Sequence, residues 1–222
     1  MNRDLIDKLA RALLYEGYVL YPYRPSVKNT QRWTFGGIYP KPWSEAQNGT
    51  DPFVMQTQCL LEGDTTAKIA VTIRFLHLID RDASWQESTE REVGTEEIEL
   101  AALLDHSRAI PIAFPAGQVV DAGVVRTWQA LKGSAEILAN PISPLSPPPV
   151  LRGRVREGAS RESLQNQNTP PLYQLTIRIE NQTELQNAQT SPRDNALLRS
   201  FISTHTILTT TGGSFISLTD PP

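Results

Sequence analysis

Apolar and polar residues alternate most regularly in two segments, residues 67–82 and residues 172–183. Successive side chains of a β-strand point to opposite faces, so this alternation predicts two strands that each have one buried face. In the second segment we expect Leu175, Ile177 and Ile179 to point inward and Thr176 and Arg178 to point outward. A shift of the pattern by one residue would bury an arginine.

Shorter apolar runs predict further strands. Residues 51–64 predict a strand that ends at a Gly-Asp turn, residues 89–100 a strand with Glu and Thr facing water, and residues 124–140 two strand-like halves around Gly133. Residues 205–222 predict a hairpin whose turn is formed by the Gly-Gly pair at 212–213.

Three segments have helical patterns. In residues 3–15, apolar residues recur at spacings of three to five with charged residues opposite, which predicts an amphipathic helix. Residues 100–107 can form two helical turns. In residues 191–203, Ser191 is a suitable N-cap and Pro192 a suitable first helical residue, so we expect a helix there.

The order of these elements indicates the fold class. The sequence has no internal repeat and no regular alternation of strand and helix, which argues against a doubly wound parallel sheet. We therefore expect a β-rich α+β protein, with an antiparallel sheet or sandwich on which an N-terminal and a C-terminal helix pack. Residues 1–222 are expected to form a single domain with long polar or proline-rich loops at 140–149 and 158–171.

Composition and charge narrow the class of protein. A net charge of −3 argues against an obligate nucleic-acid binder, which normally carries a basic excess. A single cysteine, Cys59, excludes an intramolecular disulfide framework and an all-cysteine metal site, and it suits a reducing compartment. The N-terminal residues alternate charge with apolar side chains, unlike a signal peptide, and no apolar run reaches the length of a membrane span. We expect a cytoplasmic protein.

The sequence contains no recognisable catalytic or metal-binding signature. The three histidines, His77, His106 and His205, are not spaced as metal ligands, and no nucleophile elbow, phosphate-binding loop or dinucleotide fingerprint is present. We interpret His77 as a structural residue of a strand, His106 as an exposed helix end and His205 as a helix-end residue near backbone carbonyls. Cys59 is expected to act as a small buried apolar residue. The sequence therefore predicts no cofactor, no metal and no catalytic residue.

Residues 16–40 are unusually aromatic for irregular backbone, and four of the six tyrosines fall there. Tyr, Trp and Arg are the residue types that most often dominate binding energy at interfaces, and prolines reduce the entropy that a loop loses on binding. We therefore expect a partner-binding surface made by Tyr21, Tyr23, Arg24, Arg32 and Trp33. The alternative is that the aromatic residues belong to the core and that the glycines and prolines form turns.

A second candidate surface is basic. Arg152, Arg154 and Arg156 occupy alternate positions, so a strand would present them on one face, where they could bind an acidic partner. The alternative is an ordinary solvent-exposed strand face.

Several longer segments resemble a poorly characterised bacterial family that accompanies [NiFe]-hydrogenase genes. The resemblance is carried by LLYEGYVLYPYRPSVKNTQRWTFGGIYP, MQTQCLLEGD, VTIRFLHLI, LYQLTIRIENQT and NALLRSFISTHTILTTTGGSFISLTDPP. Members of that family continue beyond the final DPP, so the chain is expected to correspond to their N-terminal region or to a split form. The resemblance implies an accessory protein whose partner is a hydrogenase subunit.

These observations favour a non-enzymatic interaction protein that assists the assembly or maturation of a [NiFe] uptake hydrogenase. The first alternative is an enzyme with a dispersed acid–base pair, such as Glu16 or Asp80 with His205. The second, less favoured, alternative is an RNA-binding module that stacks bases on aromatic side chains.

Overall fold

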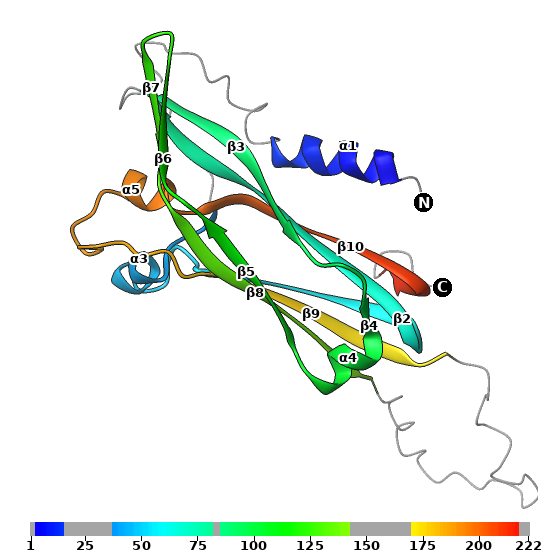
Figure 1. Ribbon diagram of the computed structural model, residues 1–222. Coiled ribbons are helices and arrows are strands. Elements are labelled where there is room, and N and C mark those ends of the chain that lie inside the picture. Colours follow the sequence, from blue (N-terminus) through cyan, green and yellow to red (C-terminus); the bar gives the residue numbers. More distant parts are fainter. Residues whose placement is uncertain (1–2, 16–36, 82–84, 143–169, 218–222) are drawn as a thin grey trace, which may run out of the picture.

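The computed structural model describes residues 3–15, 37–81, 85–142 and 170–217, and Figure 1 shows their arrangement. The strands are β1 (Gly37–Ile38), β2 (Val54–Arg81), β3 (Trp85–Gly94), β4 (Ile98–Glu99), β5 (Arg108–Phe114), β6 (Gly117–Asp121), β7 (Val124–Trp128), β8 (Leu131–Pro141), β9 (Leu172–Asn181) and β10 (Phe201–Ile216). These described strands form one antiparallel sheet, in which the main path of neighbours is β1-β10-β2-β9-β8-β5. Strands β3, β4 and β7 pair with β2 beside this path.

Strand β2 is continuous over 28 residues and includes both segments that the sequence pattern predicts as separate strands. The predicted turn at Gly63-Asp64 is therefore wrong. The reason is that β10 runs beside both halves of β2, pairing Thr211 with Lys68 and Gly213 with Gly63. Residues 64–67 form a bulge against β10 instead of a turn.

Glycines allow β2 and β10 to approach closely at this bulge. A Cβ atom on Gly63 would lie 3.0 Å from the Cα of Gly213, and the φ of Gly212 is +77°. Such a contact leaves no room for a side chain, and such a φ favours glycine. The predicted hairpin at Gly212-Gly213 is also wrong, because these two residues lie within the continuous strand β10.

The bulge divides β2 into two halves that have different neighbours. Residues 54–62 pair with β9, whereas residues 72–81 pair with β3. The sheet therefore has two wings: the first contains β5, β8, β9 and the first half of β2, and the second contains β10, β3 and the second half of β2. Figure 1 shows the long strands of both wings running side by side.

The inner core lies between the wings. Most of its fully buried members come from the second half of β2 and from the strands of the first wing, and they include Ile69, Val71, Ile73, Phe75, Ile137, Leu175, Ile177 and Ile179; Leu100 of α4 and Phe201 of β10 complete it. The predicted inward set of β9 is therefore confirmed.

The two residues predicted on the opposite face of β9, Thr176 and Arg178, differ in exposure. Arg178 keeps 39% of its side chain exposed and contacts the Glu180 carboxylate at 2.7 Å. Thr176, however, is buried, and its hydroxyl accepts a hydrogen bond from Gln58 Nε2 at 3.2 Å. Thr176 is therefore on the face opposite Leu175 and Ile177, as predicted, but it is not exposed to solvent there.

Four helices are described: α1 (Arg3–Leu14), α3 (Lys41–Ala46), α4 (Leu100–Asp105) and α5 (Arg193–Leu197). The short helix predicted within residues 100–107 is α4. The helix predicted over residues 191–203 is shorter than expected, because Phe201 already begins β10. Its N-cap is Pro192 and not Ser191. For the same reason His205 is not at a helix end; it lies in β10 opposite Arg74.

Helix α1 crosses the outer face of the sheet in an unexpected orientation (Figure 1). Ala10 and Leu14 are buried, but Leu5, Leu9 and Leu13 are 56%, 57% and 48% exposed. Three leucines of the apolar stripe seen in the sequence therefore point away from the sheet. Polar contacts help to hold the helix, among them an Asp7–Arg74 ion pair of 2.9 Å.

The architecture agrees with the predicted fold class, a β-rich α+β protein with few helices and an antiparallel sheet. Of the predicted loop 140–149, Asn140 and Pro141 belong to β8, and residues 143–149 lie outside the described residues. Among the described helices, none is long and apolar enough to cross a membrane.

We predict that Ile177→Ala lowers the free energy of unfolding by about 2–5 kcal/mol, since it removes most of a fully buried side chain from the inner core. Arg178→Ala is the matched control, and we expect it to cost less than about 1 kcal/mol, because its ion pair is partly exposed. Urea denaturation of the two variants measures both values. Equal costs would mean that the inward face is assigned incorrectly.

Candidate functional site

The candidate site lies where β3 and β5 face each other. In the described part of the chain, β3 pairs only with β2, and β5 pairs only with β8. Each of these strands therefore has one edge without a strand partner. We call the line where the two edges meet the seam (Figure 1).

One end of the seam is closed by a stack of side chains. The Arg91 guanidinium of β3 lies 4.9 Å from the ring centroid of Phe114 on β5. The Phe114 ring meets Phe75 edge to face, with ring centroids 5.9 Å apart. An arginine over an aromatic face is attractive and joins two strands that share no hydrogen-bond ladder. We call Arg91, Phe114 and Phe75 the plug.

His77 lies behind the plug and is fully buried. Its Nδ1 is 3.4 Å from Arg91 Nε, which donates a long hydrogen bond. Burial and then the Arg91 charge lower the pKa of His77 to about 4, although the nearby backbone of Gln129 opposes this shift. The ring is therefore neutral at neutral pH, which fits the structural role expected for it.

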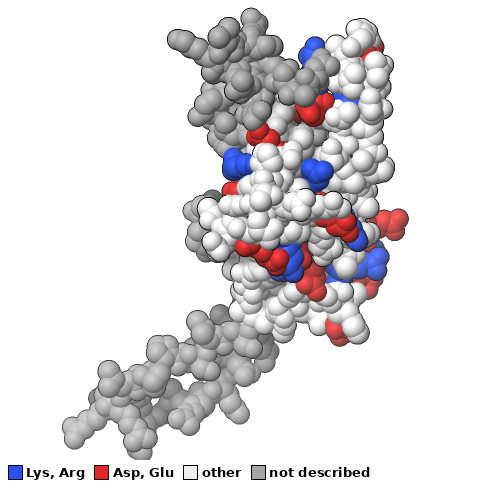
Figure 2. Space-filling view, turned by 90° about the vertical axis from the view of Figure 1, so that its left-hand side faces the viewer, with Lys and Arg blue, Asp and Glu red and all other residues white. Residues whose placement is uncertain are grey.

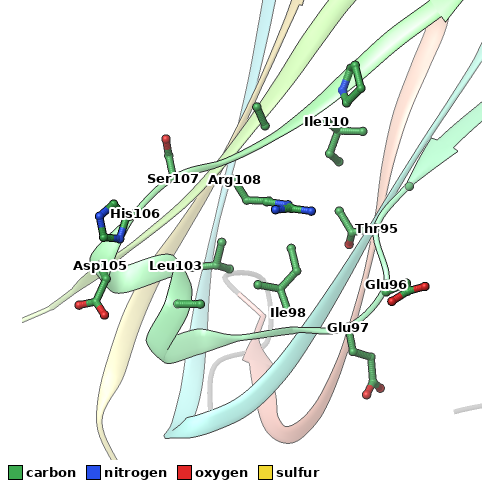
Figure 3. A pocket seen from close by; sticks show the side chains of 14 residues that line it. Thr95, Glu96, Glu97, Ile98, Leu103, Asp105, His106, Ser107, Arg108 and Ile110 are labelled. Carbon is green, nitrogen blue, oxygen red and sulfur yellow. The ribbon is translucent and has the colours of Figure 1, made fainter.

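Beyond the plug, the seam widens into a hollow of about 660 Å³. Its lining comes from the end of β3, the link to β4, helix α4 and the start of β5. Figure 3 shows Ile98, Leu103 and Ile110 around the hollow, and Leu103 and Ile110 are buried. The floor of the hollow is therefore apolar.

Arg108 projects into this hollow (Figure 3). It occupies the same face of β5 as Ile110 and Ile112, which belong to the inner core. It makes no ion pair or hydrogen bond within the described part of the chain. Every other arginine whose side chain is described has at least one such contact: Arg11, Arg74, Arg81, Arg91, Arg126, Arg178, Arg193 and Arg199.

Acidic side chains lie at the rim on both sides of Arg108. Figure 3 places Glu96 and Glu97 on one side and Asp105 on the other. Glu97 is already engaged, with Lys68 Nζ at 3.9 Å and the Thr211 hydroxyl at 3.1 Å. The charge pattern of the hollow is thus positive at the centre and negative at two opposite edges.

The hollow lacks the arrangement that acid–base catalysis requires. Asp105 and His106 point away from Arg108, and His106 is the exposed residue that follows α4, as the sequence predicts. No cluster of His, Cys, Asp or Glu able to hold a metal occurs among the described residues.

The dispersed acid–base pair considered from the sequence is not assembled either. His205 lies opposite Arg74, and Asp80 is six positions further along β2. At about 3.3 Å per residue this separates the two side chains by roughly 20 Å, so that pairing is wrong. Glu16 lies outside the described residues.

The binding surfaces predicted from the sequence lie outside the described part of the chain. This applies to Tyr21, Tyr23, Arg24, Arg32 and Trp33, and equally to Arg152, Arg154 and Arg156, so both surfaces stay predictions. Cys59 lies in β2, half-buried beside the inner core, and burial raises the pKa of its thiol. That environment suits a small apolar residue better than a reactive one.

Arg108 is not among the site residues predicted from the sequence, although a signal for it exists. The apolar run AIPIAFP begins one residue later, at Ala109, so Arg108 lies just outside it. Extending the alternation back from Ile112 and Ile110 places Arg108 on the inward face. The facing strand β3, in contrast, is brought into place by pairing with β2, which no local pattern indicates.

Comparisons with protein-family models, with curated proteins and with solved structures found no match for this chain.

The buried His77 predicts a pH dependence of stability. A folded-state pKa of about 4 lies below the ordinary value of 6.5, so protonation favours the unfolded chain. The neutral His77 ring contributes its full share to the free energy of unfolding above pH 6.5. This contribution is lost as the pH falls toward 4. We expect wild type to lose up to about 3 kcal/mol more than His77→Gln between pH 7 and pH 4. Denaturation series at several pH values test this, and parallel curves for the two proteins would contradict it.

Proposed function

We propose that this chain is a non-enzymatic interaction protein that binds an extended segment of a partner protein at the seam. The observation that carries the proposal is the pair of facing strand edges, β3 and β5, with an apolar-floored hollow between them. An unpaired strand edge presents backbone N–H and C=O groups that an added strand can bind, and pockets beside it receive alternate side chains.

The two edges are not equally suited to this role. Pro111 interrupts β5 and has no N–H group to donate, which is typical of protected edge strands. Strand β3 has no proline along its ten residues. The edge of β3 is therefore the better template for a bound segment, with β5 supplying side chains from the opposite side.

The surface charge supports a protein partner over a nucleic acid. On the face shown in Figure 2, Lys and Arg side chains are interspersed with Asp and Glu, and the described residues there form no extended basic area. Phosphate backbones are bound mainly through clustered positive charge. This favours the interaction protein over the RNA-binding alternative.

We further propose that the partner is a subunit of a [NiFe] uptake hydrogenase, which this chain helps to assemble or mature in the cytoplasm. This part of the proposal is supported by the sequence resemblance described above and not by the geometry of the seam. The single half-buried cysteine is consistent with a reducing compartment.

Filling the hollow should abolish partner capture. Ala102 lines the hollow and is exposed, so Ala102→Trp can occupy it without disturbing the core. Ala113 is exposed on the outward face of β5, and Ala113→Trp is the matched control. We expect affinity isolation from the native host to enrich a hydrogenase subunit with wild type and Ala113→Trp, and at least about tenfold less with Ala102→Trp.

Thermal melts of the three proteins accompany the isolation, so that a loss of capture is compared among folded proteins. Equal enrichment with Ala102→Trp would place the binding surface away from the seam. A specific partner unrelated to hydrogenase that is lost only with Ala102→Trp would retain the seam but reject the hydrogenase assignment.

A further inference from the structure

The side chains around the hollow specify the chemistry of the segment it accepts. Resting on the proposed function, we infer that the seam selects an extended segment with a carboxylate side chain at its centre, apolar side chains beside it on the same face, and basic side chains toward both ends.

The central carboxylate follows from Arg108. Its guanidinium projects over an apolar floor and is the one described arginine side chain without a contact. Arg91 on the facing strand, in contrast, already contacts the Phe114 ring and His77 within the protein. A guanidinium offers a planar set of donors that matches a carboxylate and binds it through two parallel hydrogen bonds.

The apolar neighbours follow from strand geometry. In an extended segment, the residues two positions before and after the carboxylate point the same way as it does. Those side chains would meet the floor made by Ile98, Leu103 and Ile110.

The basic residues expected at both ends of the bound segment follow from the acidic side chains at the rim of the hollow. Glu96 and Asp105 lie on opposite sides of Arg108, and neither has an ion pair or hydrogen bond within the described part of the chain. A segment that crosses the hollow from one rim to the other would place a basic residue near each of them. Complementary charges of this kind determine specificity and orientation at an interface.

The competing explanation is that Arg108 only protects an edge strand. An inward-pointing charge on an edge discourages pairing with other chains. That role requires no preference for any peptide, so binding measurements separate the two explanations.

The test uses the full chain and three acetylated, amidated peptides. The first is Lys-Ser-Val-Thr-Glu-Thr-Val-Ser-Lys, the second has Gln at the centre, and the third exchanges all charges, with Lys at the centre and Glu at both ends. Fluorescence polarisation of labelled peptides gives the affinities. We expect the Glu-centred peptide to bind at least about tenfold tighter than the other two, and the difference to shrink at high salt.

Variants assign the preference to residues. Arg108→Gln should reduce the Glu-to-Gln affinity ratio to about one, and Arg108→Lys should restore part of it. Arg11→Gln removes the same charge from α1, which contributes no residue to the lining of the hollow, and should leave the ratio unchanged. Glu96→Gln combined with Asp105→Asn should weaken binding of the Lys-ended peptide but keep the preference for a central Glu.

The outcomes distinguish this inference from the proposed function. If no peptide binds, or if the Glu and Gln peptides bind equally, the inference is overturned. If Ala102→Trp still abolishes partner capture in that case, the seam remains a binding site for a segment of other chemistry. If Arg108→Gln changes only the tendency of the protein to aggregate, Arg108 is an edge-protecting residue.

Discussion

Strand β2 pairs with β9 before Gly63 and with β3 from residue 72 onward, while β10 pairs with it on both sides of the bulge, over residues 60–63 and 68–76. A strand that changes one neighbour along its length must bend, and the bulge of residues 64–67 provides the bend. The close approach of Gly63 to Gly213 keeps β10 in register across it. The two wings, the inner core between them and the two facing strand edges all follow from this exchange.

The seam is a direct consequence of that arrangement. Closing a sheet into a barrel removes its edges, whereas here β3 and β5 meet without a shared ladder. The plug joins them at one end through Arg91 and Phe114, and the other end remains open as a hollow. A rigid frame with a gap between two strands is well suited to binding, because its shape is formed before a partner arrives.

Local patterns in the sequence predict the elements better than their connections. Alternation identifies β9 and the inward residues Leu175 and Ile177, because those positions depend only on which face is buried. Two Gly-containing segments look like turns locally, yet pairing between β2 and β10 makes them parts of continuous strands. The helix after Pro192 ends early, and the chain then enters β10 at Phe201, which is buried in the inner core.

The residues of the candidate site also differ in how well local sequence patterns predict them. Arg108 has a periodic signal, since it shares a face with Ile110 and Ile112. Of its acidic neighbours, Asp105 at the end of α4 is only three residues away in the sequence, whereas Glu96, just after β3, is held near it by the pairing of β3 and β4 with β2. Such pairing is decided by the whole chain, and a single segment carries no record of it.

Helix α1 illustrates how attachment through polar groups affects motion. It buries Ala10 and Leu14 but presents three leucines to solvent, and exposed ion pairs such as Arg11–Glu90 add little free energy. Elements with few buried apolar contacts open at the lowest free energy in a protein. We therefore expect helix α1 to open at a lower free energy than the sheet, and rising ionic strength to weaken its ionic attachment.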